Sequence, residues 1–266
     1  MRRLLLLGWL VAACAPASPA GGPSGLAALL ATGAWVDLSY PFDSTTIYWP
    51  TAQPFRLEVV SAQRTAAGFY YAANNIAAAE HGGTHLDAPV HFAEGKHSTD
   101  QIPLDQLIGE SVVVDVTSQV TAGGADYQIT SQLLEAAGLD SLPGKIVLFR
   151  TGWGSRWPDR ARYLGTTLTG PAAVPQLHFP GIHPNAARWL RDRGVKAVGI
   201  DTPSIDFGQS QTFESHQVLF AANIPAFENV AHLDRLPTTG AYVVALPMKI
   251  GGGSGGPLRI VAWIPD

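Results

Sequence analysis

The stretch from residue 80 to residue 92, EHGGTHLDAPVHF, gathers side chains that could bind a metal ion. His81, His85, Asp87 and His91 all occupy odd positions, so an extended chain would present them on one face of a strand. Two glycines and a proline within the stretch argue against a helix. A single histidine could equally be a hydrogen-bonded core or surface residue. Four such residues at this spacing predict a site for a first-row metal ion.

One strand face cannot surround a cation, so other segments must contribute ligands. The best candidates are His216 and Glu228, each of which stands beside an apolar run. A carboxylate in such a place is costly to bury unless it is paired or ligated. The predicted ligands are therefore five nitrogen or oxygen donors: His81, His85, Asp87, His216 and Glu228. This set is too large for one tetrahedral zinc and suits either two ions bridged by Asp87 or one ion of higher coordination number.

His91 is not needed as a ligand and lies further along the same stretch. An imidazole there could accept and return the proton of a metal-activated water. Phe92, beside it, and Trp49 are predicted to bind the substrate as parts of an aromatic wall. Further candidates for that wall, each of which could instead pack in the core or between subunits, are Phe69, Tyr70, Tyr71 and Trp153. Four acids could support ligands, or could be surface and turn acids: Glu80, Asp201, Asp206 and Glu214.

The elements that must position these residues are mostly strands. Apolar alternation or apolar runs predict strands at residues 35–39, 55–60, 69–79, 111–116, 145–151, 196–201, 241–246 and 258–264. Helices are predicted from the N-cap Thr130 to Gly138 and from Pro184 to Gly194. The last two strands are separated by a flexible glycine run, residues 251–256. This pattern predicts a β-rich α/β or α+β domain.

The N-terminal residues predict export. Residues 1–13 combine two arginines, a short apolar core and small residues, as in a secretory signal peptide too short to span a membrane stably. Cys14 follows directly, as in a bacterial lipoprotein signal, which predicts a lipid anchor; the alternative is cleavage near Ala20. Residues 14–26 are predicted to be a tether and residues 27–266 one domain. The domain is expected in the periplasm or at the cell surface.

Composition narrows the possible functions. Cys14 is the only cysteine, so the folded domain is expected to lack disulfides and thiolate chemistry. A net charge of −4, which becomes more negative without the leader, provides no basic field for nucleic acid. Hydrophobic residues make up 46% of the chain, enough for one large core.

The segment HGGTHLDAPVHF resembles the HxGTHxDxPxHF signature of the bacterial cyclase family of metal-dependent hydrolases. The similarity continues through VDLSYPF, DTPSID, ESH, AFENVAHLDRLP and PMKIGGGSGGPLRIVAWI, and so covers almost all of the chain after the tether. The resemblance implies the same five metal ligands and a catalytic acid/base role for His91. It also implies a swivelling β/β/α fold and a dimer or tetramer.

The resemblance further implies hydrolysis of a formamide or amide C–N bond. The branch of kynurenine formamidase converts N-formylkynurenine to kynurenine and formate in tryptophan catabolism, and one or two Zn²⁺ or Mn²⁺ ions are expected. Isatin hydrolase-like cleavage of a lactam is the alternative, because residues 150–165, RTGWGSRWPDRARYLG, look more like that branch. The export signal is a second departure from the formamidases, which are usually shorter and cytoplasmic. A non-catalytic lipoprotein that binds a metal is the alternative from another class.

Overall fold

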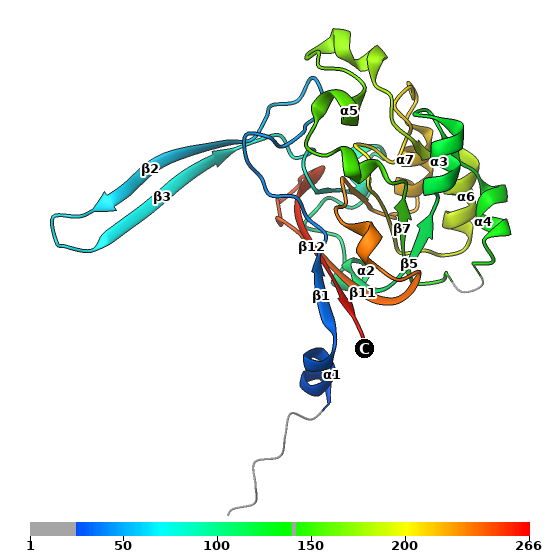
Figure 1. Ribbon diagram of the computed structural model, residues 1–266, viewed down its shortest axis with the longest axis horizontal. Helices are drawn as coiled ribbons and strands as arrows, with labels where there is room; N and C mark the ends of the chain where they lie inside the picture. Colours follow the sequence, from blue (N-terminus) through cyan, green and yellow to red (C-terminus); the bar gives the residue numbers. More distant parts are fainter. Residues whose placement is uncertain (1–24, 140–141) are drawn as a thin grey trace, which may run out of the picture.

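A computed structural model of the chain describes residues 25–139 and 142–266 (Figure 1). The predicted signal peptide and all but the end of the tether lie outside the described residues. The strands are β1 (Ala34–Asp37), β2 (Arg56–Arg64), β3 (Tyr70–Ala77), β4 (His85–Asp87), β5 (Ile108–Asp115), β6 (Gln128–Ile129), β7 (Ile146–Arg150), β8 (Gly181–Ile182), β9 (Ala197–Ile200), β10 (Ala226–Glu228), β11 (Thr239–Pro247) and β12 (Gly255–Ile264). The α-helices are α1 (Leu26–Thr32), α2 (Leu104–Leu107), α3 (Thr117–Gly123), α4 (Ser131–Ala136), α5 (Arg160–Leu164), α6 (Pro184–Asp192) and α7 (Glu214–Phe220). The 3-10 helices are η1 (Pro89–His91), η2 (Trp153–Arg156), η3 (Pro171–Gln176) and η4 (Leu233–Arg235).

The main sheet closes on itself. Its strand order is β1-β12-β11-β5-β7-β9-β10-β4, and β4 also pairs with β12, so that seven strands form a closed barrel with β1 added outside. The neighbours β5, β7, β9 and β10 run parallel, whereas β4, β11 and β12 pair antiparallel. The predicted β-rich α/β class is confirmed.

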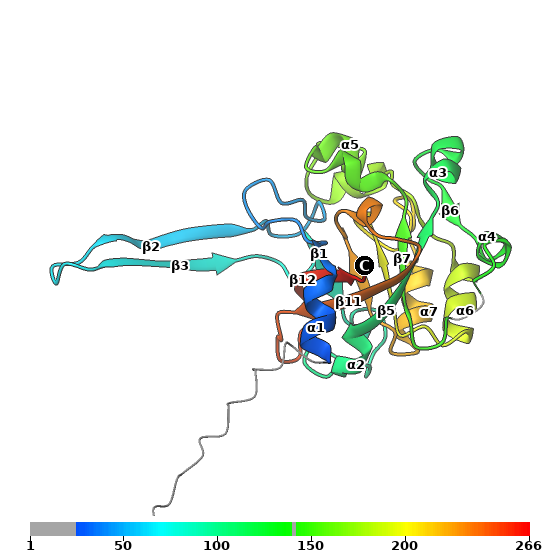
Figure 2. The same ribbon diagram turned by 60° about the horizontal axis from the view of Figure 1, so that its bottom comes forward.

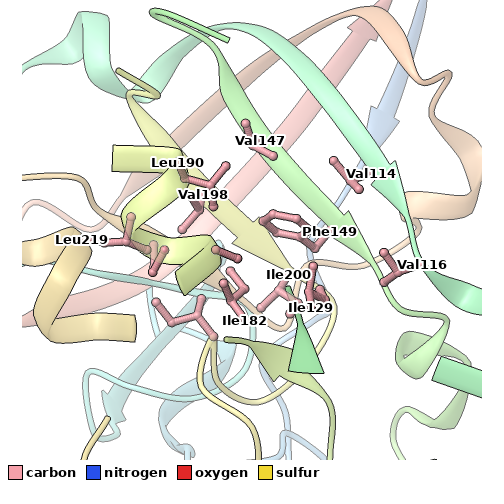
Figure 3. Packing of buried hydrophobic residues seen from close by; sticks show 14 of the residues in the cluster. Val114, Val116, Ile129, Val147, Phe149, Ile182, Leu190, Val198, Ile200 and Leu219 are labelled. Carbon is pink, nitrogen blue, oxygen red and sulfur yellow. The ribbon is translucent and has the colours of Figure 1, made fainter. Parts of the chain in front are cut away.

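The parallel strands read as continuous apolar runs because both of their faces are buried. Along β7, Val147 and Phe149 belong to a core between the barrel and the helices, while Ile146 and Leu148 belong to a second core inside the barrel. Figure 3 shows the outer core, in which the strand residues meet Leu190 of α6 and Leu219 of α7. Two cores on either side of one sheet hold the strand ends, and hence the site, in fixed positions.

Helices α4, α6 and α7 lie together on one side of the barrel (Figures 1 and 2). Both predicted helices are present. Thr130 caps α4 by accepting a hydrogen bond from the Leu133 amide, and α6 begins at Pro184. No helix among the described residues has the length and apolar character needed to cross a membrane.

The histidine-rich stretch differs from its prediction as one continuous strand. Only residues 85–87 form a strand, β4, while His91 ends the 3-10 helix η1. His81 precedes two glycines, of which Gly83 has a positive φ of 57°. A Cβ at Gly82 would overlap the ring of Tyr48, so the chain bends here where only glycine fits. The bend and η1 replace strand alternation as the reason why these side chains meet.

Candidate active site

The five predicted ligands converge from three separate elements and from the bend before β4, which holds His81. His85 and Asp87 lie on β4, His216 lies on α7, and Glu228 ends β10. β10 pairs antiparallel with β4, which places Glu228 opposite His85. All but His81 are buried, and His81 is only partly exposed.

The donor atoms form two groups that share Asp87: His81, His85 and Asp87 in one, and Asp87, His216 and Glu228 in the other. Asp87 Oδ1 lies 2.6 Å from His81 Nδ1 and 3.1 Å from His85 Nε2. The other carboxylate oxygen, Oδ2, lies 3.2 Å from His216 Nε2. Glu228 approaches His216 Nε2 at 3.1 Å and His85 Nε2 at 3.4 Å. Asp87 thus turns one oxygen toward each group.

In each of the three histidines of the cluster, the ring nitrogen that faces away from the centre contacts a polar group, which fixes the orientation of the ring. His85 Nδ1 faces the Gly83 carbonyl at 3.0 Å, and His216 Nδ1 faces Asp206 Oδ2 at 2.6 Å. His81 Nε2 faces Ser254 Oγ at 2.9 Å. When these outer nitrogens carry the protons, all three lone pairs point to the centre, which is the arrangement a metal ion requires.

The two buried carboxylates of the cluster, Asp87 and Glu228, give it the negative charge that a cation site needs. Burial raises the pKa of Glu228, and the nearby Asp87 raises it further. Burial acts to raise the pKa of Asp87 as well, but His81 and His85 outweigh it and hold that pKa well below its usual range. Two buried carboxylates this close repel each other, and a cation bound between them relieves the repulsion while both stay ionised. The donor set therefore fits a divalent metal ion.

His91 lies beside the cluster, and its ring stacks on that of His81 with centroids 3.9 Å apart. Among the described residues, its ring nitrogens have no hydrogen-bond partner, and the side chain lines a cavity of about 300 Å³. Burial lowers the pKa of His91 to about 4. The imidazole is thus neutral at neutral pH and open to a molecule in the cavity.

The cavity has an aromatic wall. Trp49 and Phe92, both predicted substrate-binding residues, line it together with Phe213. The Phe213 ring lies 5.2 Å from that of Phe92 and 6.1 Å from that of Trp49, so the three form one continuous surface. Trp153 is not part of this wall, because its side chain is buried in the outer core and its Nε1 donates to the Tyr163 carbonyl.

The glycine run before β12 supports the cluster rather than only linking strands. Ser254 donates from its amide and its hydroxyl to Glu80 Oε2, at 3.0 and 2.6 Å, and meets His81 on its other side. A Cβ at Gly255 would come within 2.5 Å of His81 Cε1. Ser254 and Phe213 were not predicted as parts of the site. A hydroxyl within the glycine run and an aromatic residue three positions before His216 were the available signals.

Asp206 holds His216 from behind. Its Oδ2 accepts from the backbone amide of His216 as well as facing Nδ1, and its Oδ1 accepts from the Ser215 amide. The carboxylate therefore fixes the start of α7 and the plane of the imidazole. Of the two alternatives that the sequence left open for Asp206, the structure shows contact with the predicted ligand His216.

Replacing Asp206 with asparagine is expected to weaken metal binding by about 10- to 100-fold, because His216 loses the group that orients it. Titration of the metal-free protein with Zn²⁺ or Mn²⁺ measures the dissociation constant directly. Asp201 is a matched control, since it is equally buried but binds the Thr151–Gly154 loop instead. An Asp201→Asn variant should keep the wild-type affinity. Equal affinity for the metal in wild type and Asp206→Asn would contradict the role of Asp206.

Comparison with known proteins shows which family shares this arrangement. The family model described as "Cyclase: Putative cyclase" matches residues 36–207. Isatin hydrolase from Roseibium aggregatum is 33% identical over 209 residues, covering 74% of this chain and 77% of that protein. Kynurenine formamidase from Salinibacter ruber is 30% identical over 232 residues, covering 86% and 96%. The solved structure of isatin hydrolase A from Ralstonia solanacearum matches with a TM-score of 0.80 at 32% identity, covering 93% of this chain and all of that one.

The family predicted from the histidine signature is thereby confirmed. The match spans the bend at Gly82 and Gly83, β4 and Asp206, and the likeness in structure extends over nearly the whole chain. By sequence and by fold, the chain belongs to the cyclase family.

Proposed function

We propose that this chain is a metal-dependent hydrolase that cleaves the C–N bond of a small aryl amide. The observation that carries the proposal is the His91 imidazole, which has no hydrogen-bond partner among the described residues. It lies beside the cluster of five donors, in a cavity with an aromatic wall. Relatives named kynurenine formamidase and isatin hydrolase bear out the predicted class of reaction. A non-catalytic metal-binding protein would need neither a cavity at the cluster nor a spare imidazole facing it.

The cluster is proposed to hold one or two divalent ions, zinc or manganese. Both metals accept imidazole and carboxylate ligands. If two ions are held, Asp87 would be the residue that both share, because it turns one oxygen toward each group of donors. A divalent ion held there would supply Lewis-acid chemistry: it would lower the pKa of a water molecule to about 7 and polarise a carbonyl oxygen.

Side chains of the protein position the substrate and transfer the proton. Trp49, Phe92 and Phe213 hold the aryl group, which sets the amide carbonyl against the cluster. His91 accepts a proton from the attacking water and returns it to the leaving amine nitrogen, so the C–N bond breaks with a neutral leaving group. Ser254 and Asp206 keep the imidazoles of His81 and His216 fixed throughout.

Two substrates fit this chemistry. The first is N-formylkynurenine, by similarity to the kynurenine formamidases. The second is the neutral lactam isatin, and a specific observation favours it. None of the described residues that line the cavity is a lysine or arginine, so no cationic side chain there meets the carboxylate of N-formylkynurenine.

Parallel assays of metal-reconstituted protein with N-formylkynurenine, isatin and phenyl acetate test the proposal. Turnover of at least one amide with kcat/KM well above that of the ester is expected. A tenfold preference between the two amides decides which substrate class is correct. Hydrolysis of the ester alone, or of none of the three, contradicts the proposed amide hydrolysis.

The chain is also proposed to be exported and held at a membrane by lipid on Cys14. This proposal rests on the sequence of residues 1–24, which lie outside the described residues. In a bacterial host, labelled palmitate is expected to enter the wild-type chain and to be absent from a Cys14→Ser variant. Equal labelling of both chains, or of neither, contradicts the anchor.

A further inference from the structure

The carbonyl oxygen of Gly83 has two hydrogen-bond partners, and one of them lies outside the donor cluster. His85 Nδ1 is 3.0 Å from this oxygen, and the side-chain nitrogen of Asn229 is 2.6 Å from it. Asn229 directly follows Glu228 at the end of β10, is only 2% exposed and is one of the residues that line the cavity. A carbonyl oxygen has two lone pairs, so these two donors use both of them.

The surroundings of Asn229 fix the orientation of its side-chain amide. An amide oxygen facing the Gly83 carbonyl at 2.6 Å would repel it, so the amide nitrogen must lie on this side. On the other side, Asn229 Oδ1 accepts a hydrogen bond from the Tyr163 hydroxyl at 2.8 Å. That hydroxyl also lies 2.9 Å from the backbone carbonyl oxygen of Asp201, so two acceptors share its one proton. Both polar atoms of the Asn229 side chain are therefore paired, and the amide cannot turn without breaking both bonds.

Tyr163 connects residues 150–165, RTGWGSRWPDRARYLG, to the site. It lies on α5 and is fully buried, and its ring packs edge-on against the Trp157 ring with centroids 5.3 Å apart. Its backbone carbonyl accepts a hydrogen bond from Trp153 Nε1 at 2.8 Å. Burial raises the pKa of the Tyr163 hydroxyl well above its usual range, so the hydroxyl stays protonated and can donate. A firmly held donor from this segment thus reaches, through one amide, the carbonyl that His85 contacts.

A simpler role for Asn229 is to hold the turn after β10. Its φ of 53° lies in the left-handed region, which asparagine tolerates better than most residues do. Glycine would serve that backbone role equally well, so the turn does not account for the two side-chain hydrogen bonds. Asn223 also has a left-handed backbone, with φ 57°, but its side chain accepts from the His97 amide and is not part of the cavity lining. Comparison of the two asparagines therefore separates the backbone role from the side-chain role.

We propose that Asn229 is a positioning residue for His85 and acts through the Gly83 carbonyl. The Tyr163 hydroxyl in turn orients Asn229. A carbonyl held in one place accepts the Nδ1 proton of His85, which leaves the lone pair of Nε2 free to face the centre of the cluster. The inference rests on the proposed function, because it requires that His85 binds a metal ion.

Titration of the metal-free protein with Zn²⁺ tests the role of Asn229. An Asn229→Gly variant removes the amide without straining the backbone. It is expected to bind zinc about tenfold more weakly, because the acceptor of the His85 Nδ1 proton is no longer fixed. Asn223→Gly makes the same substitution at a second left-handed position and should bind zinc as the wild type does. Far-UV circular dichroism shows whether each variant is folded, and Tyr163→Phe serves as the test variant if Asn229→Gly is not.

A double-mutant cycle tests whether Tyr163 acts through Asn229. Tyr163→Phe alone is expected to weaken zinc binding less than Asn229→Gly does, because the amide keeps its bond to Gly83. In the double variant the hydroxyl has nothing left to orient, so the affinity should equal that of Asn229→Gly alone. Tyr40→Phe is the control, since it removes a hydroxyl that donates to the Gly154 carbonyl instead, and it should bind zinc normally. Additive losses in the double variant would overturn the part assigned to Tyr163.

The Nδ1 proton of His85 provides a readout that does not depend on turnover. In zinc-loaded protein labelled with ¹⁵N-histidine, this proton is expected to exchange with water about tenfold faster in Asn229→Gly than in the wild type, because water can then reach the Gly83 carbonyl from the cavity. The Nδ1 proton of His216 contacts Asp206 instead and should exchange at the wild-type rate in the same sample.

The possible failures can be told apart. Equal zinc affinity of the wild type and Asn229→Gly overturns this inference and leaves the proposed function intact. Weaker binding with unchanged exchange of the His85 proton also overturns it, because the loss would then arise at Glu228 or in the turn. A wild-type chain that binds neither Zn²⁺ nor Mn²⁺ overturns the proposed function and this inference with it.

Discussion

An Asp87→Asn variant is expected to lose its bound metal and to turn over substrate about a thousandfold or more slowly. Asp87 is the residue shared by both donor groups, with oxygens 2.6 Å from His81, 3.1 Å from His85 and 3.2 Å from His216. Asparagine keeps the shape of the side chain but removes the charge that holds a cation, so water is no longer activated at neutral pH. Elemental analysis of the purified protein gives the metal content, and initial rates on the preferred amide give the turnover.

Asp126→Asn is the control for this change. Asp126 is an exposed acid that pairs with His178 and is absent from the cluster, so its variant should keep both metal and rate. A fully active Asp87→Asn protein with its metal content unchanged would show that the cluster is not the catalytic centre. The wild-type metal content also decides between one ion per chain and two.

A His91→Ala variant is expected to keep its metal but to lose about a hundredfold or more in kcat. The imidazole has no hydrogen-bond partner among the described residues and faces the cavity. Its removal therefore takes away the group that carries the proton but breaks no hydrogen bond to a predicted metal ligand. Elemental analysis and steady-state kinetics on the same preparation separate the two effects.

His178→Ala is the control for His91, because His178 is an exposed imidazole that, within residues 25–139 and 142–266, pairs only with Asp126. It should leave kcat unchanged. If His91→Ala lost metal together with activity, His91 would be a ligand. If kcat stayed at the wild-type level with metal bound, another group would carry the proton.

Much of the barrel could be predicted from sequence because its strands have strong local patterns. The runs around Val113 and Leu148 are apolar on both faces, and the structure places them between two cores. Thr130 and Pro184 marked helix starts through capping chemistry that acts within a few residues. Short helices such as α2 and α5 escaped prediction, because tertiary contacts rather than periodicity stabilise helices of four or five residues.

The predicted residues of the candidate site do come together, but a bend in the chain and not one continuous strand brings them there. The spacing of His81, His85 and Asp87 suggested one strand face, whereas the chain bends at Gly82 and Gly83 to bring them together. Supporting groups were harder to foresee. Ser254 lies 173 positions along the chain from His81, so its contact depends on the closure of the barrel.

The seam where β4 meets β12 also sets an order of assembly. The strand that carries His85 and Asp87 finds its second neighbour only in residues 255–257, and His81 is steadied by Ser254. Residues 254–257 must therefore be synthesised before the donor cluster can make its full set of contacts. Chains that end before residue 254 would keep all five predicted ligands but lose the second neighbour of β4 and the hydroxyl that contacts His81, and we expect them to bind metal more weakly.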